Sequence, residues 1–406
     1  MQISLGIKTD IKYYSIVVPL LLVSIMLLYG ESVVYGRPRV KPALYNIELL
    51  KKLRHSYLYN NEDLSLFLNK ADIIVSSIPV TVQDKDKSFS TNPHDYCSIS
   101  RYAWPSNTDP SVYIIRDGET NSEWNLYDLP KLETLSSRLK YLSAAYYITH
   151  KRQYYDAFSK HLKAWFLDAE TCMHPNMEYA QVHPGKNNNK GMPYGLVDVN
   201  RFTPIIESIC LLQSVKRLDK KTRRGMEQWF SELLCWVLNS EQWEVESKGN
   251  NNIIASLYVV LVEMARYTGD KETMQKLSLE YKEKVLDVQI DDAGRQPAEL
   301  RRTIGFGYSV SNLNSIIDFC LIMEQEKMHF YQENQNRIDS AFEYLLQFVG
   351  NHEAFPYRQD SAWEGYEDKL ERNVLRLNRM EVKNRRIKFF NKEERITSGT
   401  IINYVY

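Results

Sequence analysis

The sequence predicts an all-α fold built from antiparallel helical hairpins, and three observations support that class. Beyond Asp128, apolar residues recur every three or four positions in one segment after another, as they do on the buried face of an amphipathic helix. No convincing alternation of apolar and polar residues, which would indicate half-buried strands, separates these segments. Successive helices with connections of variable length pack as antiparallel neighbours.

Two short helices are expected before this series. Apolar positions that begin at Ile47 and at Leu64 predict them between residues 42 and 70. The stretch 71–106 then loses the helical period and is rich in Ser, Asn, Pro and aromatic residues. It predicts a long loop region, and long loops in compact domains are usually functional.

The helices beyond Asp128 follow from the apolar series, and Thr203 followed by Pro204 predicts an N-cap and a first-turn proline for one of them. Hairpins that close into a ring leave a central cavity. The long polar connections 171–202 and 286–300 are then expected to form a cleft at one end of that ring. The apolar series lie at 135–146, 155–166, 205–212, 226–237, 253–267, 274–285, 313–323 and 338–349.

The composition excludes some classes of function. Lys plus Arg (51) balances Asp plus Glu (51), so no overall positive field recruits nucleic acid. The 28 tyrosines suit a groove that stacks on sugar rings, although most of them are expected in the core or on the surface. The five cysteines are scattered and lack CxxC spacing, which predicts neither a disulfide framework nor a zinc site.

The amino end carries an export signal. Lys8 and Lys12 precede an apolar run over residues 13–29, and small residues follow at Gly30 and Gly36. This pattern predicts a secretory signal peptide or, because the run is near the lower limit for a membrane span, an uncleaved membrane anchor. In either case the body of the protein is expected to be secreted or to lie in the periplasm or cell envelope.

Three regions are therefore expected along the chain. Residues 1–36 form the signal peptide or anchor, and residues 37–350 form the helical domain. Residues 351–406 are strongly charged and predict a C-terminal helix followed by a tail.

Four polar, aromatic-rich segments interrupt the helical pattern, and each has a structural explanation when taken alone. Asn250 to Asn252 precede an apolar helix and suit N-caps. Glu299 and Arg302 suit an exposed ion pair near a helix start, and Tyr308 suits simple packing about two turns later. The segments are 94–106 with 114–124, 173–185 with 194–202, 248–258, and 296–315.

Taken together, these residue types suit the lyase cleavage of a polyuronate. Such an enzyme removes a weakly acidic proton next to a carboxylate, so it must first neutralise that carboxylate with amide or guanidinium donors. A Tyr or His must then take the proton, and the same or another group must protonate the departing glycosidic oxygen. No metal or other cofactor is expected, and an Arg beside a Tyr is expected to lower the pKa of that Tyr by favouring its phenolate.

Several segments of the sequence resemble a known family. HDYCSISRYAWPS, TCMHPNMEYAQVHPG, GLVDVNRFTPIIESICLL and QPAELRRTIGFGYSVSNL, in this order over about residues 75–325, are similar to the alginate lyase domain of polysaccharide lyases. The resemblance implies an (α/α) toroid of the incomplete-barrel kind, cofactor-free β-elimination, and an acidic polysaccharide such as alginate as the partner.

The resemblance also implies roles for residues of this chain. Tyr308 corresponds to the catalytic base and acid, and Arg302, or else Arg301, to its charge partner. In KGNNNIIASLY, Asn251 and Asn252 correspond to the asparagines that neutralise the carboxylate. The histidine that follows them in the family is missing, and Asn252 or Ile253 holds its place.

Further residues are expected to contact the sugar chain. His183 is a candidate to replace the missing histidine in space, and Glu299 is a further candidate in the cleft. The cleft-lining loop is expected to contribute Asn176, Tyr179, Gln181 and Arg201, and the opposite wall His94, Tyr96, Tyr102 and Trp104.

Three functions remain open at this point. The first is an active polyuronate lyase in which Tyr308 serves as both base and acid. The second is a non-catalytic polysaccharide-binding protein on a lyase scaffold, which the missing histidine suggests. The third is a glycoside hydrolase, which needs two carboxylates across a cleft, with Glu178, Asp198 and Glu299 as the suggestive acids.

Overall fold

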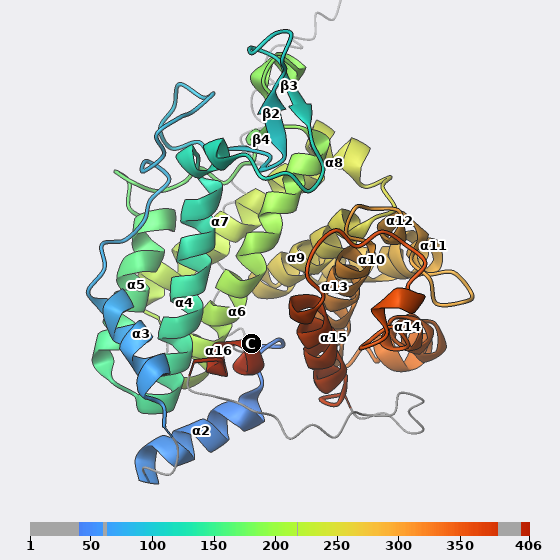
Figure 1. The fold of residues 1–406 in the computed structure, drawn as a ribbon. Coiled ribbons are helices and arrows are strands. Elements are labelled where there is room, and N and C mark those ends of the chain that lie inside the picture. The colour runs from blue at the N-terminus through green and yellow to red at the C-terminus, as the bar shows by residue number, and fades with distance from the viewer. Residues whose placement is uncertain (1–39, 60–62, 217, 381–398) are drawn as a thin grey trace, which may run out of the picture. The chain divides into compact units, whose positions relative to one another are not determined.

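The helices of the protein follow one another as hairpins (Figure 1). The computed structural model describes residues 40–59, 63–216, 218–380 and 399–406, and within them Lys41–Tyr406 form one compact unit. The helices are α2 (Ile47–Tyr59), α3 (Ser65–Val75), α4 (Leu129–Thr149), α5 (Arg152–Phe166), α6 (Thr203–Val215), α7 (Lys220–Leu238), α8 (Glu241–Glu246), α9 (Asn252–Thr268), α10 (Lys271–Tyr281), α11 (Asp287–Gln289), α12 (Pro297–Leu300), α13 (Gly305–Gln325), α14 (Phe330–Leu346), α15 (Glu364–Leu377) and α16 (Ile401–Val405).

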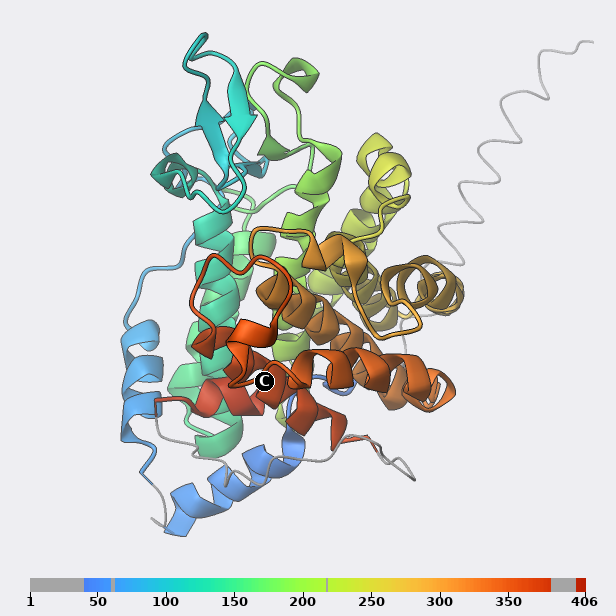
Figure 2. The same cartoon turned by 45° about the vertical axis from the view of Figure 1, so that its right-hand side comes forward.

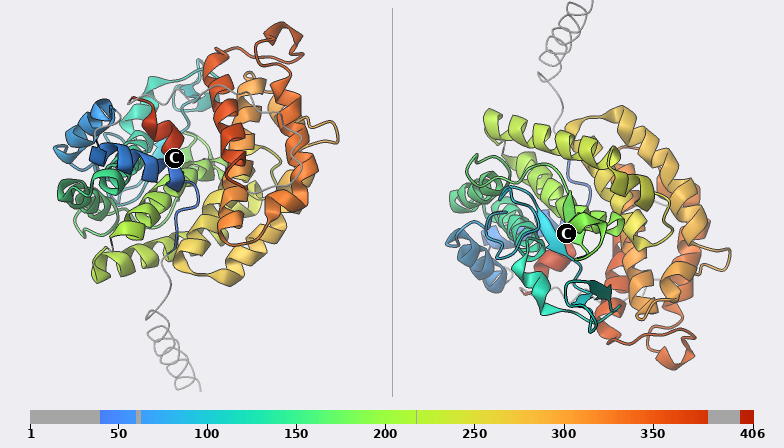
Figure 3. Two further views of the ribbon diagram at one scale, coloured as in Figure 1. Left: turned by 90° about the horizontal axis from the view of Figure 1, so that it is seen from below. Right: turned by 90° about the horizontal axis from the view of Figure 1, so that it is seen from above.

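Six of the eight apolar series read from the sequence each lie within one helix of this arrangement. The series 274–285 runs from α10 into the π-helical turn Lys282–Leu286, and the series 338–349 ends beyond the last residue of α14. Helix α4 packs on α5 and α6, α9 packs on α7, α10 and α13, and α13 packs on α14. Seen along the orthogonal direction in Figure 3, the green, yellow and orange helices follow one another around a curve. Hairpins arranged in this way leave their inner faces directed at a common interior.

Helix α9 is buried over most of its length. Its apolar residues are not restricted to one stripe, and Ile254, Leu257, Val260 and Leu261 are all fully buried. A helix that is apolar on all sides is stable only when other elements surround it. The sequence therefore places α9 in the core.

Four short strands lie in the loops at one end of the helices, where Figures 1 and 2 show them together. Strand β1 (Cys97–Ile99) pairs in parallel with β4 (Tyr179–Val182), and β2 (Ala103–Pro105) pairs antiparallel with β3 (Tyr113–Ile115). These strands have only three or four residues each, so alternation of apolar and polar positions does not reveal them.

The 3₁₀ helix η3 (Pro193–Phe202) runs directly into α6. The predicted N-cap at Thr203 is therefore wrong. Thr203 is the first residue of α6 and follows Phe202, whose backbone is already helical, so no free helix end is left for a side chain to cap.

The charged segment 351–406 belongs to the same compact unit as the helices before it. Helix α15 packs on α13, and α16 packs on α2 and α4. In the described part of this segment, Leu370, Val374 and Ile401 are buried. The described parts of this segment thus pack on the helices that precede it.

The expected signal peptide or anchor, residues 1–36, lies outside the described residues. Within the described part of the chain, none of the helices has the length and apolar character needed to cross a membrane.

Candidate active site

A cavity of about 920 Å³ opens among the loops that carry the strands and extends between the helices. Its walls come from the loop that follows β1, from β4 and η3, from the start of α9, and from one face of α13. All four polar segments singled out in the sequence contribute side chains to its walls, among them Tyr102, Gln181, Asn252, Arg302 and Tyr308. The cavity is thus formed by segments that are far apart in the chain.

Arg302 and Tyr308 form the best-defined pair in this cavity. The guanidinium carbon of Arg302 lies 3.9 Å from the centroid of the Tyr308 ring. Asp117 holds the other side of the guanidinium through two hydrogen bonds, from Nη2 at 2.8 Å and from Nε at 3.2 Å. Because Asp117 binds one edge of the guanidinium and the Tyr308 ring lies against its face, the arginine is pre-organised beside the tyrosine.

Burial raises the pKa of Tyr308 well above its ordinary value, and a hydrogen bond with Tyr102 raises it further. The charge of Arg302 lowers this pKa, as expected from the sequence, but it does not outweigh the other two causes. Tyr308 is therefore a neutral hydroxyl at pH 7.

The start of α9 provides an amide to the same cavity. Asn251 is the N-cap of α9, and its side chain accepts a hydrogen bond from the nitrogen of Ile253 at 3.0 Å. This role occupies Asn251 and leaves Asn252 and Ile253 to line the cavity. The asparagine available to a ligand is thus Asn252. Ile253 follows it, and the family resemblance leaves one of these two residues at the place of the histidine.

Glu299 lies just behind this helix start. It is buried, and its Oε1 accepts a 2.7 Å hydrogen bond from the nitrogen of Asn252. Burial raises the pKa of Glu299 to about 7. Because Glu299 is buried and bonded to α9, the exposed ion pair with Arg302 that the sequence suggested is wrong.

Gln181 and Asp198 form another wall. Gln181 has a φ of 47°, a left-handed conformation that is uncommon for a residue other than glycine. It is held there by a hydrogen bond from its nitrogen to Ser98 Oγ at 2.7 Å and by one from Nε2 to Asp198 Oδ1 at 2.8 Å. Such local strain persists only where the surroundings fix it, and it is common at ligand sites.

Asp198 accepts two further hydrogen bonds, from Tyr96 at 3.0 Å and from Ser98 at 2.6 Å. Tyr96 is fully buried and acts on the cavity only through Asp198. Burial raises the pKa of the Asp198 carboxyl, and the three donors lower it. We interpret Asp198 as a residue that orients Gln181.

Arg201 also lines the cavity, as expected from the sequence. Its guanidinium donates to Glu133 at 3.1 Å and to Asn200 at 2.6 Å. Arg101, another lining residue, donates to the same carboxylate of Glu133 at 3.1 Å. Two arginines thus share one acid, which leaves positive charge on this wall.

Several predicted contact residues are not among the residues that line the cavity. Arg301 is exposed, and Trp104 donates its ring nitrogen to the Glu119 carbonyl at 2.9 Å. Tyr179 packs in the small cluster around β1, and Asn176 caps the nitrogen of Glu178 at 3.1 Å. These residues hold the loops in place.

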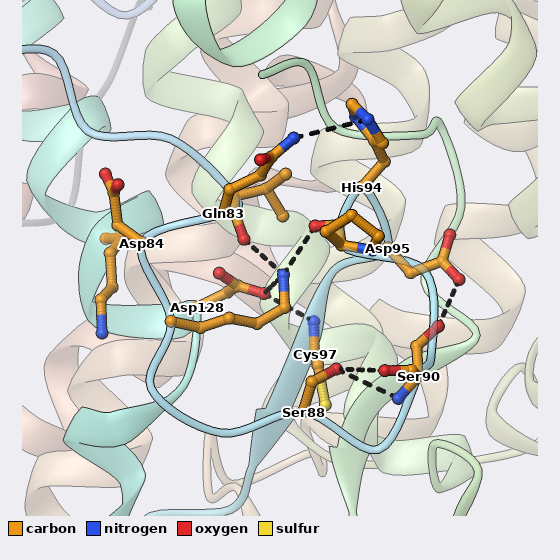
Figure 4. A network of polar contacts seen from close by, with 12 residues as sticks. Gln83, Asp84, Ser88, Ser90, His94, Asp95, Cys97 and Asp128 are labelled. Atoms are coloured by element: carbon orange, nitrogen blue, oxygen red, sulfur yellow. Dashed lines mark hydrogen bonds and ion pairs between the residues drawn. The ribbon is translucent and has the colours of Figure 1, made fainter. Parts of the chain in front are cut away.

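The histidines are also engaged elsewhere. His183 is buried and is hydrogen-bonded to the Tyr113 carbonyl, while its Nδ1 lies 3.4 Å from the hydroxyl of the lining residue Tyr194. Figure 4 shows His94 in a separate polar network with Gln83 and Asp95. There its Nδ1 contacts the Cys172 carbonyl at 2.6 Å. Neither histidine lines the cavity, so neither takes the place of the missing one.

The network in Figure 4 anchors β1. Lys85 and Asp128 form a buried ion pair at 3.2 Å, and Asp128 accepts the nitrogen of Cys97 at 2.9 Å. Burial raises the pKa of Asp128 to about 7. The loop between α3 and β1 is thereby fixed to the start of α4. Helix α3 extends to Val75, so this loop begins later than the expected residue 71.

Sequence reasoning missed Asp117, which holds Arg302, and the lining residues Ser311, Asn314 and Lys369. Asp117 lies within a segment that was singled out, but nothing in the sequence pairs it with Arg302. Ser311 and Asn314 do carry a signal, since they continue the face of Tyr308 at helical spacing. Lys369 lies in a charged run that reads as a solvated surface.

The protein consists of helical hairpins around a cavity that contains an Arg-Tyr pair and an asparagine amide. These features define the class of (α/α) toroid polysaccharide lyases, and the comparisons with known proteins agree. The alginate lyase family model matches residues 80–355, so the chain belongs to the alginate lyase family. The family and the fold class expected from the sequence motifs are both confirmed.

A solved structure gives the same result. The chain is similar to an alginate lyase from Bacteroides ovatus, with a TM-score of 0.78 and 30% identity over 84% of this chain and 93% of that chain. A second match is alginate lyase A1-III from Sphingomonas species A1, with a TM-score of 0.46 and 13% identity over 75% of this chain and 85% of that chain. No curated protein matches the chain. The family and the first structure support a polysaccharide lyase with an acidic polysaccharide as substrate.

Proposed function

We propose that the protein cleaves a polyuronate such as alginate by β-elimination, without a metal ion, and that it acts outside the cytoplasm. The observation that carries the proposal is the Arg302-Tyr308 pair in the cavity of a family member, 3.9 Å from guanidinium to ring centroid. An arginine fixed by Asp117 suits the carboxylate of a uronate, and a tyrosine beside it suits proton transfer at the neighbouring carbon.

The proposed reaction uses residues of one wall. Arg302 and the Asn252 side chain bind the uronate carboxylate and so acidify the proton on the adjacent carbon. Tyr308, as its phenolate, takes that proton, and the electron pair of the broken C–H bond forms the new carbon-carbon double bond. The bond from the β carbon to the glycosidic oxygen breaks, and Tyr308 returns the proton to that oxygen. Proton and charge therefore balance with one tyrosine.

Binding of substrate also favours the phenolate form of Tyr308, whose proton is released to solvent water before the reaction. A sugar that occupies the cavity displaces the hydrogen bond between Tyr102 and Tyr308, which favours the neutral hydroxyl of Tyr308. Arg302 then remains as the neighbour that favours the phenolate. The single hydroxyl of Tyr308 replaces the two-residue arrangement that a histidine would complete, because Ile253 cannot transfer a proton.

The placement of Ile253 favours a second candidate function, a polysaccharide-binding protein without catalysis. In that case the cavity retains its amide and guanidinium donors but lacks an effective base. The hydrolase reading has less support. Of Glu178, Asp198 and Glu299, only Asp198 lines the cavity, and Glu178 instead forms an ion pair with Lys190 at 2.6 Å.

The two candidates are separated by incubating the protein with a panel of polyuronates and following the ultraviolet absorbance of unsaturated uronate ends. We expect a signal on at least one polymer that persists with a chelator and disappears in Tyr308→Phe. Binding by calorimetry without any absorbance change would replace the lyase by the binding protein. A signal abolished by the chelator would contradict the proposed metal independence.

A further inference from the structure

The cavity does not end at the Arg302-Tyr308 pair. Ser311, Asn314, Ser315 and Asp318 line it further along α13 and continue the face of Tyr308. Since an α-helix rises about 1.5 Å per residue, the ten positions from Tyr308 to Asp318 correspond to about 15 Å of wall. This inner half is therefore a distinct place along the cavity, and every one of these four side chains is polar.

The inner half carries a lysine without an acidic partner. Lys369 projects from α15 to line the cavity, and its Nζ donates to Ser311 Oγ at 3.2 Å. Within the described residues, Lys369 forms no ion pair. Burial lowers its pKa, which shows that the surrounding protein does not compensate the charge.

The other charges around Lys369 increase the excess of positive charge. Arg201, Arg372 and Arg376 act on it as like charges, and Asp318 acts in the opposite sense. Asp318, however, is already bound to Arg376 and accepts the Asn314 amide at 3.0 Å. The negative charge of Asp318 is thus largely neutralised by Arg376 and does not compensate Lys369.

A second lysine adds to this imbalance. Lys140 of α4 lies 5.0 Å from the centroid of the Tyr406 ring, another lining residue, and burial lowers the pKa of Lys140. The charge of Arg201 acts on Lys140 as well. Ammonium groups removed from water are costly unless an anion or a set of acceptors satisfies them.

We propose that the inner half of the cavity is a second anionic subsite, in which Lys369, with Ser311 and Asn314, binds the carboxylate of a uronate residue beyond the one that reacts. The subsite rests on the proposed function for its substrate class. It makes recognition depend on chain length, since only an oligouronate long enough to reach from Tyr308 toward Asp318 engages both places. It also requires a charged, not an esterified, carboxyl group at the inner position.

The test measures binding apart from cleavage. Calorimetric titration of the Tyr308→Phe protein with a series of oligouronates of increasing length should show affinity rising once the chain reaches the inner half. Adding Lys369→Gln should remove that rise, lowering the affinity for the longer oligomers about tenfold, the scale of a charged hydrogen bond. The affinity for the shortest oligomers should be unchanged.

Three further variants control for misfolding and for general charge effects. Lys369→Arg keeps the charge and should keep most of the dependence of affinity on oligomer length. Ser315→Glu places a negative charge in the inner half and should weaken the binding of the longer oligomers. Lys276→Gln, on the exposed face of α10, should change nothing.

The outcomes distinguish this proposal from the one on which it rests. Length-dependent binding that needs Lys369, in a protein that yields no unsaturated product from any polyuronate, would leave the subsite standing and remove the lyase. In the opposite outcome, the native protein cleaves a polyuronate, but Lys369→Gln and Ser315→Glu do not change the affinity for oligomers. This result would overturn the proposed subsite and keep the proposed lyase activity.

Discussion

The backbone nitrogen of Asn252 donates a 2.7 Å hydrogen bond to the buried carboxyl of Glu299, and this bond joins the start of α9 to the segment that carries Arg302. The two elements that provide the amide and the guanidinium are thus fixed to one another. The protonation state of Glu299 then becomes part of the stability of the site.

The first prediction concerns this carboxyl. Its pKa is about 7 in the folded protein, above the ordinary value of 4.5, so the folded state retains a proton that the unfolded state loses. The stabilisation is present below pH 4.5 and is lost as pH rises through 7, by an amount of roughly 3 kcal/mol at most. Urea unfolding at pH 5 and pH 8 should show this loss for the native protein.

Glu299→Gln should lose less stability over the same pH range, because the amide carbonyl still accepts from Asn252 and does not titrate. Asp128, whose pKa is also about 7, contributes equally to both proteins and cancels in the comparison. Identical pH dependence in the two proteins would show that Glu299 is not the titrating group.

The second prediction compares two adjacent arginines. Arg302→Ala should lower kcat/KM on the preferred polyuronate by about 10²–10³, the scale of removing one charge-stabilising donor. Arg301→Ala, with the same chemistry at an exposed position, should retain activity within about twofold. Steady-state kinetics of both variants decide the assignment, and a large loss in Arg301→Ala would reverse it.

The third prediction concerns the pH profile of the reaction. Burial and the bond with Tyr102 raise the pKa of Tyr308, so kcat/KM should increase with pH above neutrality as the free protein forms more phenolate. Tyr102→Phe removes one of these causes and should shift the rising limb to lower pH. A profile that rises at the same pH in both proteins would exclude this hydrogen bond as a control on Tyr308.

The fourth prediction concerns the backbone behind Gln181. A Cβ at Gly195 would lie 2.0 Å from the Ala180 carbonyl oxygen, so η3 can approach β4 only with glycine there. Gly195→Ala should destabilise the protein by at least about 1–3 kcal/mol, the usual cost of overpacking, and weaken oligouronate binding as Gln181 moves.

Gly365 provides the matched control for this substitution, since nothing lies within 4 Å of a Cβ built there. Gly365→Ala should leave binding unchanged and raise the free energy of unfolding by up to about 1 kcal/mol, because alanine favours the helix. Thermal unfolding and calorimetry of both variants test the pair. Equal effects at the two glycines would contradict the close approach.

The sequence predicted the helices well because their apolar period is local. It could not reveal the pairing of Cys97 with Tyr179 in β1 and β4, since strands of three or four residues show no alternation. It left the register of Asn251 and Asn252 open, and only the cap geometry, with Asn251 bound to the nitrogen of Ile253, separates their roles. Sequence spacing suggested Arg302 beside Tyr308 but contained no information on Asp117, which lies 185 positions away.

The ion pair between Asp117 and Arg302 also joins two parts of the chain that are synthesised far apart in time. Closing a loop of this length costs chain entropy, which the hairpins between the two residues help to offset. We therefore expect this pair, and the cavity wall that it holds, to form late in folding. A chain that ends before α13 has no Tyr308 and no completed cavity.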